Sequence, residues 1–218
     1  MIVRMRIDPP VADEILLTVI RHGETESNAV QRYIGQGDSP LSPRGLEQVE
    51  ALARRFADEA IDALYSSDLG RAERTAAAIA RSTGLAPMLD ERLRERQYGE
   101  LEGLGYRESI DRFPETFAAF DRFDIDTPIP GGESARQVRD RVASFVDEHV
   151  LPHGGRSIVA VCHGGIMRTF LWHLLDLPYR AARYARSDNT SVSAFRLRRG
   201  RWNLQLWNDT SHGSTDRG

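Results

Sequence analysis

Three short apolar runs, each followed by polar residues and then by a helical pattern, constrain the fold of this chain most strongly. They cover residues 15–20, 61–65 and 157–162. An apolar run of this length is typical of a strand that is buried on both faces, as in a parallel sheet covered by helices. Alternation of such strands with helices indicates βα units around one sheet. We therefore predict an α/β fold with three layers, α/β/α, and a mostly parallel central sheet.

Helical periodicity predicts four helices, at 45–58, 71–83, 133–150 and 165–175. In the third, Val138, Val142 and Phe145 belong to a set of apolar residues at steps of three and four, which forms one apolar face. Near the end of the chain, residues 191–197 and 202–207 alternate apolar and polar side chains around an Arg-Gly-Arg turn. That pattern predicts an antiparallel hairpin at the edge of the sheet.

A length of 218 residues suits a single compact domain, which we place at residues 14–209. Residues 1–13 carry prolines and acids before the first strand and are expected to form an extension outside the core. Residues 210–218 are expected to be a disordered tail. Residues 98–132 fit no regular unit and contain Gly, Pro and aromatic residues, which predicts an insertion of short helices and loops that covers the active site.

The composition favours a cytoplasmic protein without a nucleic-acid or membrane partner. Charged residues make up 28% of the chain and the formal net charge is -3, so no broad basic surface for nucleic acid is indicated. No apolar stretch has the length of a membrane-spanning helix, and the run at 15–20 is too short for the core of a signal peptide. The single cysteine, Cys162, excludes an intramolecular disulfide and fits a reducing compartment.

Residues suited to phosphate chemistry follow the predicted strands at the points where these strands end. His22 lies in Arg21-His22-Gly23 after the first strand, and His163 precedes two glycines after the third. The carboxyl ends of parallel strands meet at one edge of a sheet, where open α/β sheets bind their ligands. The second strand leads to Arg71 at the start of a helix. Histidine can attack phosphorus when one ring nitrogen is unprotonated and the other is held by a hydrogen bond.

These motifs and several others occur in the order found in a known family. The additional pieces are Asn28, Gly37-Asp38-Ser39-Pro40-Leu41-Ser42 with Gly45, Ser66-Ser67-Asp68-Leu69, Ala72 and Thr75, Leu93-Arg94-Glu95, Gly99 with Glu102-Gly103, and Gly131-Gly132-Glu133-Ser134. From residue 15 to about residue 209 the chain resembles the histidine phosphatase superfamily, which has the phosphoglycerate mutase-like fold, and within it the phosphatase branch.

The resemblance implies a metal-independent phosphomonoesterase that works through a phosphohistidine intermediate. His22 would be the phosphorylated nucleophile, and Arg21, Arg71 and His163 would surround the three non-bridging phosphoryl oxygens. Glu95 would be the proton donor, which protonates the leaving oxygen and later deprotonates the attacking water. Arginine and histidine supply the positive charge in such a site, so neither a metal nor a cofactor is expected.

Three further residues are expected to bind the substrate: Asn28, Gln36 and Gly164. The resemblance implies a small-molecule phosphate ester as substrate and leaves its identity open. Five residues of the insertion are expected to line a pocket that is partly apolar and partly cationic: Tyr106, Arg107, Phe113, Phe117 and Phe120. The oligomeric state is open as well. A homodimer is one alternative, because Trp202 and Trp207 of the edge hairpin offer a place for a second copy to extend the sheet.

Two other functions remain as alternatives. A phosphoglycerate mutase would use the same histidine but return the phosphate to a sugar acid. By the resemblance, mutases carry Asn after the second His-Gly, whereas Gly165 stands here and favours hydrolysis. An inactive binding or regulatory member of the fold would have lost part of the catalytic set, and in this chain the set is intact.

Overall fold

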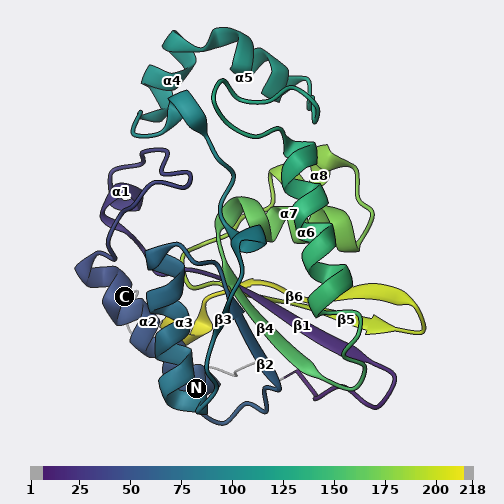
Figure 1. The fold of residues 1–218 in the computed structure, drawn as a ribbon. Helices are drawn as coiled ribbons and strands as arrows, with labels where there is room; N and C mark the ends of the chain where they lie inside the picture. Colours follow the sequence, from purple (N-terminus) through teal and green to yellow (C-terminus); the bar gives the residue numbers. More distant parts are fainter. Residues whose placement is uncertain (1–6, 214–218) are drawn as a thin grey trace.

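The computed structural model describes residues 7–213, and its centre is a six-stranded sheet with the strand order β3-β2-β4-β1-β5-β6 (Figure 1). The strands are β1 (Ile15–Arg21), β2 (Ala63–Ser66), β3 (Met88–Leu89), β4 (Ser157–Cys162), β5 (Val192–Arg198) and β6 (Arg201–Asp209). Strands β1 to β4 pair in parallel, whereas β5 runs antiparallel to β1 and β6 antiparallel to β5. The predicted mostly parallel sheet with an edge hairpin is confirmed.

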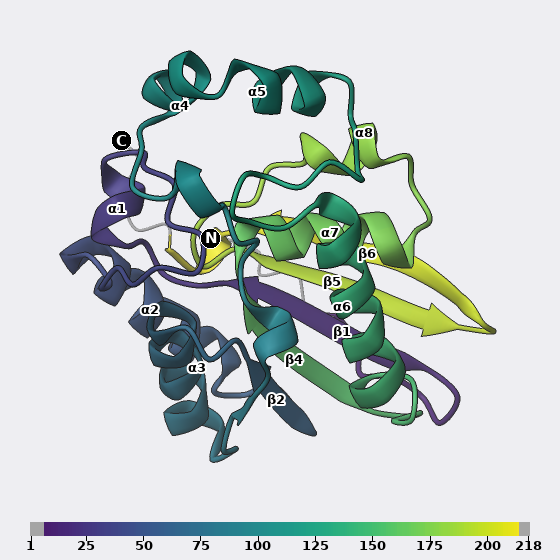
Figure 2. The same ribbon diagram turned by 45° about the horizontal axis from the view of Figure 1, so that its top comes forward.

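Helices cover both faces of this sheet and complete the predicted three layers (Figure 2). Alternate side chains of β1 point to opposite faces, as strand geometry requires. Leu16 and Ile20 pack with α2 (Pro43–Phe56) and α3 (Gly70–Thr83). On the other face, the core contains residues of β1 such as Leu17 together with α6 (Ala135–His149) and α7 (Gly164–Leu174).

The four long helices begin or end within two residues of their predicted limits, and capping decides the ends. Helix α2 starts before the predicted residue 45 because Ser42 caps it and Pro43 occupies its first turn. Ser134 and Gln137 form a capping box at the start of α6. Gly84 ends α3 in the left-handed conformation, with φ 76°.

The segment 98–132, which was predicted to be an insertion, is built from short elements. It contains η2 (Gly99–Leu101), α4 (Tyr106–Arg112) and α5 (Pro114–Asp121), and both ribbon views place α4 and α5 away from α2 and α3 (Figures 1 and 2). The insertion has a small apolar cluster of its own, built on Leu101, Phe117, Phe120 and Ile129. The other short elements are α1 (Glu26–Ala29), η1 (Glu91–Leu93), α8 (Tyr179–Arg183) and η3 (Ser211–Gly213).

The described residues near both ends, 7–13 and 210–213, differ from the predictions. The described part of the N-terminal extension lies against the body, because Ile7 packs on the core at α2 and α3 and the carbonyl of Asp8 accepts a hydrogen bond from Arg196. The predicted disorder does not hold for residues 210–213, because η3 forms there and Arg55 contacts His212 at 3.2 Å. Residues 1–6 and 214–218 lie outside the described residues.

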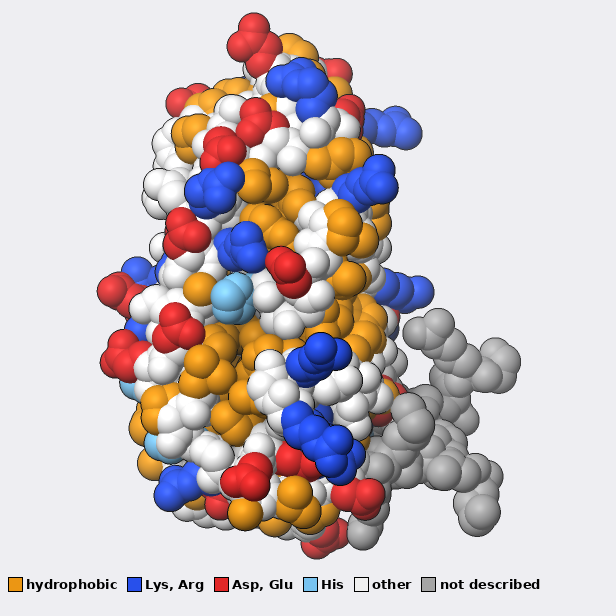
Figure 3. Space-filling view, turned by 90° about the vertical axis from the view of Figure 1, so that its right-hand side faces the viewer, with side chains coloured by type: hydrophobic (Ala, Val, Ile, Leu, Met, Phe, Trp, Pro, Cys, Tyr) orange, Lys and Arg blue, Asp and Glu red, His pale blue; other side chains and the backbone are white. Residues whose placement is uncertain are grey.

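Within residues 7–213, no helix is long and apolar enough to cross a membrane. Figure 3 shows one side of the molecule, on which arginine and acidic side chains are interspersed with hydrophobic ones. On the edge hairpin, Trp202 and Trp207 pack partly against the core, and the indole of Trp207 donates to the carbonyl of Arg186 at 2.8 Å.

Candidate active site

The pairing of β1 with β4 brings the two histidines together. Arg21 and Cys162 are paired at the ends of their parallel strands. The residue that follows each of them is a histidine, so both histidines lie at the same edge of the sheet. The N–H of His22 donates to the carbonyl of Cys162 at 3.0 Å. The ring centroids of His22 and His163 are 5.0 Å apart. Two strands that are far apart in sequence thus deliver two imidazoles to one place.

Hydrogen bonding sets the tautomer of His22. Its Nδ1 lies 2.7 Å from the carbonyl oxygen of Gly23. A carbonyl oxygen only accepts hydrogen bonds, so Nδ1 carries the proton and Nε2 keeps its lone pair. Burial lowers the pKa of His22 well below its usual value, and the nearby charges of Arg21 and Arg71 lower it further. The ring is therefore a neutral imidazole with a nucleophilic Nε2 at pH 7.

Two buried guanidinium groups stand beside this imidazole. Arg71 donates to the carbonyls of Gly37 and Gly35, at 2.9 and 2.6 Å. Arg21 donates through Nη1 to the carbonyl of Ser187 at 2.7 Å. The Nε atoms of both arginines are buried and have no hydrogen-bond partner within the described residues. Buried donors of this kind are costly unless an acceptor meets them, and phosphate oxygens suit guanidinium donors best.

His163 supplies a third donor of the same kind. Its Nε2 lies 2.9 Å from Oγ of Ser67, and that oxygen already accepts the N–H of Leu69. The Ser67 hydroxyl can donate to Nε2, and in that arrangement the ring proton lies on Nδ1. This Nδ1 is buried without a partner in residues 7–213. Burial lowers the pKa of His163 well below its usual value, with a further contribution from His22.

Glu95 is held from several sides. Its carboxylate accepts the N–H of Arg96 at Oε1, 2.8 Å away, and the N–H of Gly165 at Oε2, 3.0 Å away. Its own carbonyl accepts from Gln36 and Arg141, both at 3.1 Å. A Cβ atom at position 165 would lie 2.2 Å from Oε1 of Glu95. The carboxylate can occupy this place only because residue 165 is glycine.

Most of the site residues predicted from the sequence line one cavity. These are Arg21, His22, Asn28, Arg71, Glu95 and Gly164. His163 is not among the residues that line this cavity, and its ring centroid lies 5.0 Å from that of His22. Gln36 does not line this cavity, because its side chain is turned to the carbonyl of Glu95. The structure gives Gln36 a contact that holds Glu95, and its contact with the substrate stays a prediction.

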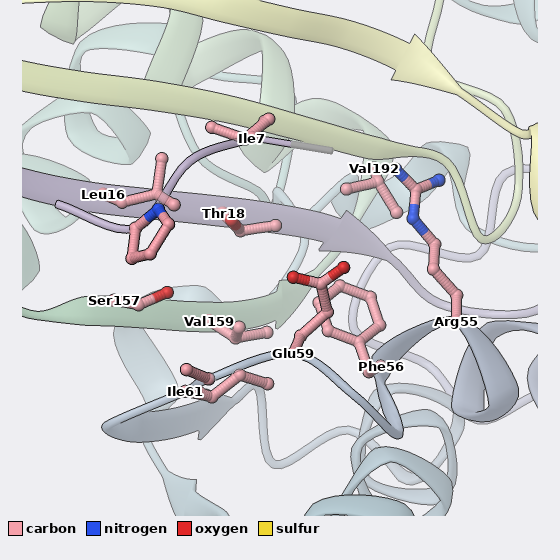
Figure 4. Close-up of a pocket in the computed structure, with 12 residues that line it drawn as sticks. Ile7, Leu16, Thr18, Arg55, Phe56, Glu59, Ile61, Ser157, Val159 and Val192 are labelled. Carbon is pink, nitrogen blue, oxygen red and sulfur yellow. The ribbon is translucent and has the colours of Figure 1, made fainter. Parts of the chain in front are cut away.

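A different cavity lies on the sheet face at α2, near the starts of β1 and β4 (Figure 4). It is lined by apolar side chains such as Leu16, Phe56 and Val159, with Glu59 and Arg55 at its side. Neither histidine reaches it. The chemistry of the chain is concentrated at the opposite ends of these strands.

The comparison with known families agrees with this geometry. The family model described as histidine phosphatase superfamily, branch 1, matches residues 17–210. The chain belongs to the histidine phosphatase superfamily. The resemblance read from the sequence motifs is confirmed.

Similar members of the histidine phosphatase superfamily include two proteins of Arabidopsis thaliana. Phosphoglycerate mutase-like protein 4 is 39% identical over 213 residues, which cover 95% of this chain and 90% of that protein. A metal-independent phosphoserine phosphatase is 35% identical over 212 residues, with coverage of 95% and 87%. Among solved structures, a mycobacterial glucosyl-3-phosphoglycerate phosphatase matches with a TM-score of 0.79 and 32% identity, covering 89% of this chain and 99% of that one.

Sequence reasoning missed several residues of this histidine phosphatase site. Tyr33, Tyr98 and Arg168 also line the cavity. Arg168 could have been predicted from the sequence, because it follows Gly164 by one helical turn on α7 and so faces the same side. No sequence pattern pointed to Asn189, whose amide donates to the carbonyl of His22 at 3.1 Å and to Oδ1 of Asn28 at 3.2 Å.

Of the five insertion residues expected to line a pocket, only Phe120 lines one of the cavities around the site. Phe113 and Phe117 pack inside the insertion's own cluster. Tyr106 is 59% exposed and stacks edge-on with Phe117. These aromatic side chains therefore pack mainly against other residues of the insertion.

Burial of the two neutral histidines predicts that stability falls with acidification. Below the unfolded pKa of about 6.5, His22 and His163 bind protons in the unfolded chain but not in the folded one, so the free energy of unfolding decreases as the pH decreases. Two such groups should remove about 2 kcal/mol between pH 6.5 and 5.5. Urea unfolding in phosphate-free buffer at both pH values measures this difference. An unfolding free energy that stays constant would contradict the neutral state of the rings, and His22→Asn should remove about half of the change.

Proposed function

We propose that the protein is a metal-independent phosphomonoesterase that transfers phosphate to His22 and then to water. The observation that carries the proposal is a set of three buried nitrogens that have no hydrogen-bond partner within residues 7–213, on Arg21, Arg71 and His163, close to the neutral imidazole of His22. The phosphoryl group has three non-bridging oxygens, on which charge accumulates during transfer. Fixed donors around these oxygens stabilise the transition state.

In the first step, Nε2 of His22 attacks phosphorus and a P–N bond forms. The P–O bond to the organic group breaks, and its electron pair stays on the leaving oxygen. Glu95, in its protonated form, gives that oxygen its proton. The developing charge on the imidazole is accommodated by the hydrogen bond from Nδ1 to the carbonyl of Gly23.

In the second step, water attacks the phosphohistidine. The carboxylate of Glu95 takes a proton from the water as the new P–O bond forms, and the P–N bond breaks with its electron pair returning to Nε2 of His22. Inorganic phosphate leaves, and both side chains recover their starting states. Glu95 therefore serves as the general acid in the first step and as the general base in the second.

The position of Gly165 supports hydrolysis over mutase activity. Its N–H binds Oε2 of Glu95, and the absence of a Cβ leaves room for Oε1. An asparagine at this place would displace the carboxylate that activates water. The similarity to a metal-independent phosphoserine phosphatase also supports hydrolysis without a metal.

Phosphate release from a panel of esters tests the proposal. The panel contains 3-phosphoglycerate, phosphoserine, sugar phosphates and nitrophenyl phosphate, each with and without EDTA. We expect release of inorganic phosphate that EDTA leaves unchanged. Full loss of activity in EDTA would overturn the metal-independent mechanism. Interconversion of phosphoglycerates with added bisphosphoglycerate, without phosphate release, would instead assign the protein to the mutases.

A further inference from the structure

Asn28 lines the cavity at His22, and its hydrogen bonds decide which end of its amide faces the cavity. Its Oδ1 accepts the backbone N–H of Thr25 and the side-chain amide of Asn189, both at 3.2 Å. A carbonyl oxygen has two lone pairs, so both acceptor positions of Oδ1 are occupied. The Nδ2 atom of Asn28 carries two hydrogens that meet no acceptor within residues 7–213. These hydrogens are therefore available to a bound phosphate.

The amide of Asn189 has only one possible orientation. The carbonyl oxygen of His22 can only accept a hydrogen bond, so the amide atom of Asn189 that lies 3.1 Å from it is the nitrogen. The second hydrogen of this nitrogen goes to Oδ1 of Asn28. An Asn28 amide turned by half a rotation would bring its own NH₂ group against two donors, those of Thr25 and Asn189. The network therefore selects one orientation of Asn28.

A strained residue holds the loop that carries Asn189, directly before β5. Thr190 has φ 57°, a left-handed conformation that β-branched residues rarely adopt. Its N–H lies 3.1 Å from the carbonyl of Arg21 and 3.2 Å from that of His22, and its hydroxyl donates to the carbonyl of Asn189 at 2.7 Å. Residues in such conformations persist only where the surrounding structure over-determines them, commonly at active sites. The loop is thus fixed to the backbone of the nucleophile.

Asn189 itself does not line the space that the substrate would occupy. It lines neither the cavity at His22 nor the larger cavity beside it. The two cavities share three residues, Tyr33, Tyr98 and Arg168. Any effect of Asn189 on the reaction must therefore pass through the groups that it holds, which are Asn28 and the carbonyl of His22.

We infer that Asn189 is a positioning residue for phosphate transfer: it fixes the amide of Asn28 so that Nδ2, and not Oδ1, faces the transferred phosphate. The inference rests on the proposed function, since it concerns the stabilisation of the group that moves to His22. A donor that is already oriented stabilises the charge that develops on the phosphoryl oxygens without having to reorient during the reaction. An Oδ1 atom in the same place would repel those oxygens.

A double-mutant cycle tests whether Asn189 acts through Asn28. With nitrophenyl phosphate as substrate, we expect Asn28→Ala to lower kcat/KM by about 10²-fold, the usual effect of one lost donor. Asn189→Ala should lower kcat/KM by about 10-fold, because the Asn28 amide remains but is no longer fixed. In the Asn28→Ala background, Asn189→Ala should change kcat/KM by less than about two-fold. An equal loss in both backgrounds would overturn the inference, because Asn189 would then act independently of Asn28.

Asn203→Ala is the matched control. Asn203 is exposed on β6, its amide donates to the carbonyl of Arg201 at 3.0 Å, and it lines neither cavity. This variant should keep the kcat/KM of the wild type, and circular dichroism checks that all variants fold. If Asn189→Ala does not fold, Asn189→Ser supplies the same cycle, because a hydroxyl has one hydrogen and cannot donate to two acceptors.

Calorimetric binding of orthovanadate, which mimics a phosphoryl group during transfer, gives a second cycle that needs no turnover. We expect Asn189→Ala to weaken binding by about 5-fold, the usual strength of one hydrogen bond, and to have no such effect in the Asn28→Ala background. Unchanged binding in Asn189→Ala would overturn the inference. A wild type that binds orthovanadate but hydrolyses no ester would overturn the proposed function and leave the binding cycle to decide the inference.

Discussion

Replacing His22 with alanine is expected to abolish phosphatase activity, with a fall in kcat of roughly 10⁴-fold or more. The variant loses the nitrogen to which phosphorus would bond, while the donors on Arg21, Arg71 and His163 remain. Substrate binding should therefore persist although turnover stops. Because His22 is only 3% exposed, thermal unfolding and circular dichroism must accompany the assay.

A trapping experiment makes this prediction specific to a phosphohistidine. Wild-type protein that is mixed with labelled substrate and quenched in base should carry label that acid removes, since a phosphohistidine is stable to base and labile to acid. The His22→Ala variant should carry none. His153→Ala serves as the matched control, because His153 lies in the turn before β4 and lines neither cavity. Label on a folded His22→Ala protein would refute the assignment of the nucleophile.

Replacing Glu95 with glutamine is expected to lower kcat/KM by about 10²- to 10⁴-fold for alkyl phosphates, whose leaving oxygen needs a proton. For nitrophenyl phosphate, the leaving group needs little protonation, so kcat/KM should change by only a few-fold. The ratio kcat/KM is the informative quantity because it reports the steps up to transfer to His22. Equal losses on both substrates would contradict the role of Glu95 as proton donor.

Gly165→Ala tests the same carboxylate without removing it. The added Cβ would lie 2.2 Å from Oε1 of Glu95, so the carboxylate must move. We expect this variant to lower kcat/KM for alkyl phosphates in the same sense as Glu95→Gln. Gly105→Ala is the control, because a Cβ there meets no atom within 4 Å. Full activity of Gly165→Ala would show that the position of Glu95 is not critical.

Predictions based on short stretches of sequence agreed well with the structure. The run at 157–162 coincides with β4, and the His-Gly pairs follow β1 and β4 at the same edge. Such features depend on side-chain pattern and on backbone geometry over a few residues. The need for glycine at position 23 comes from packing instead. The backbone of Gly23 is not left-handed, and a Cβ there would lie 2.6 Å from Val49, so glycine is needed for the close approach of α2.

The sequence by itself determined the layered α/β fold and the family to which the chain belongs, because hydrophobic pattern and ordered motifs are local properties. Only the tertiary structure decided how the site is held and what lies around it. Gln36 and Gly165 hold Glu95 across 59 and 70 residues of chain, and Arg183 meets Phe120 only because α8 packs beside the insertion. These contacts join segments whose sequences contain no signal of one another, so they arise only when the core forms and places both segments at the same edge of the sheet.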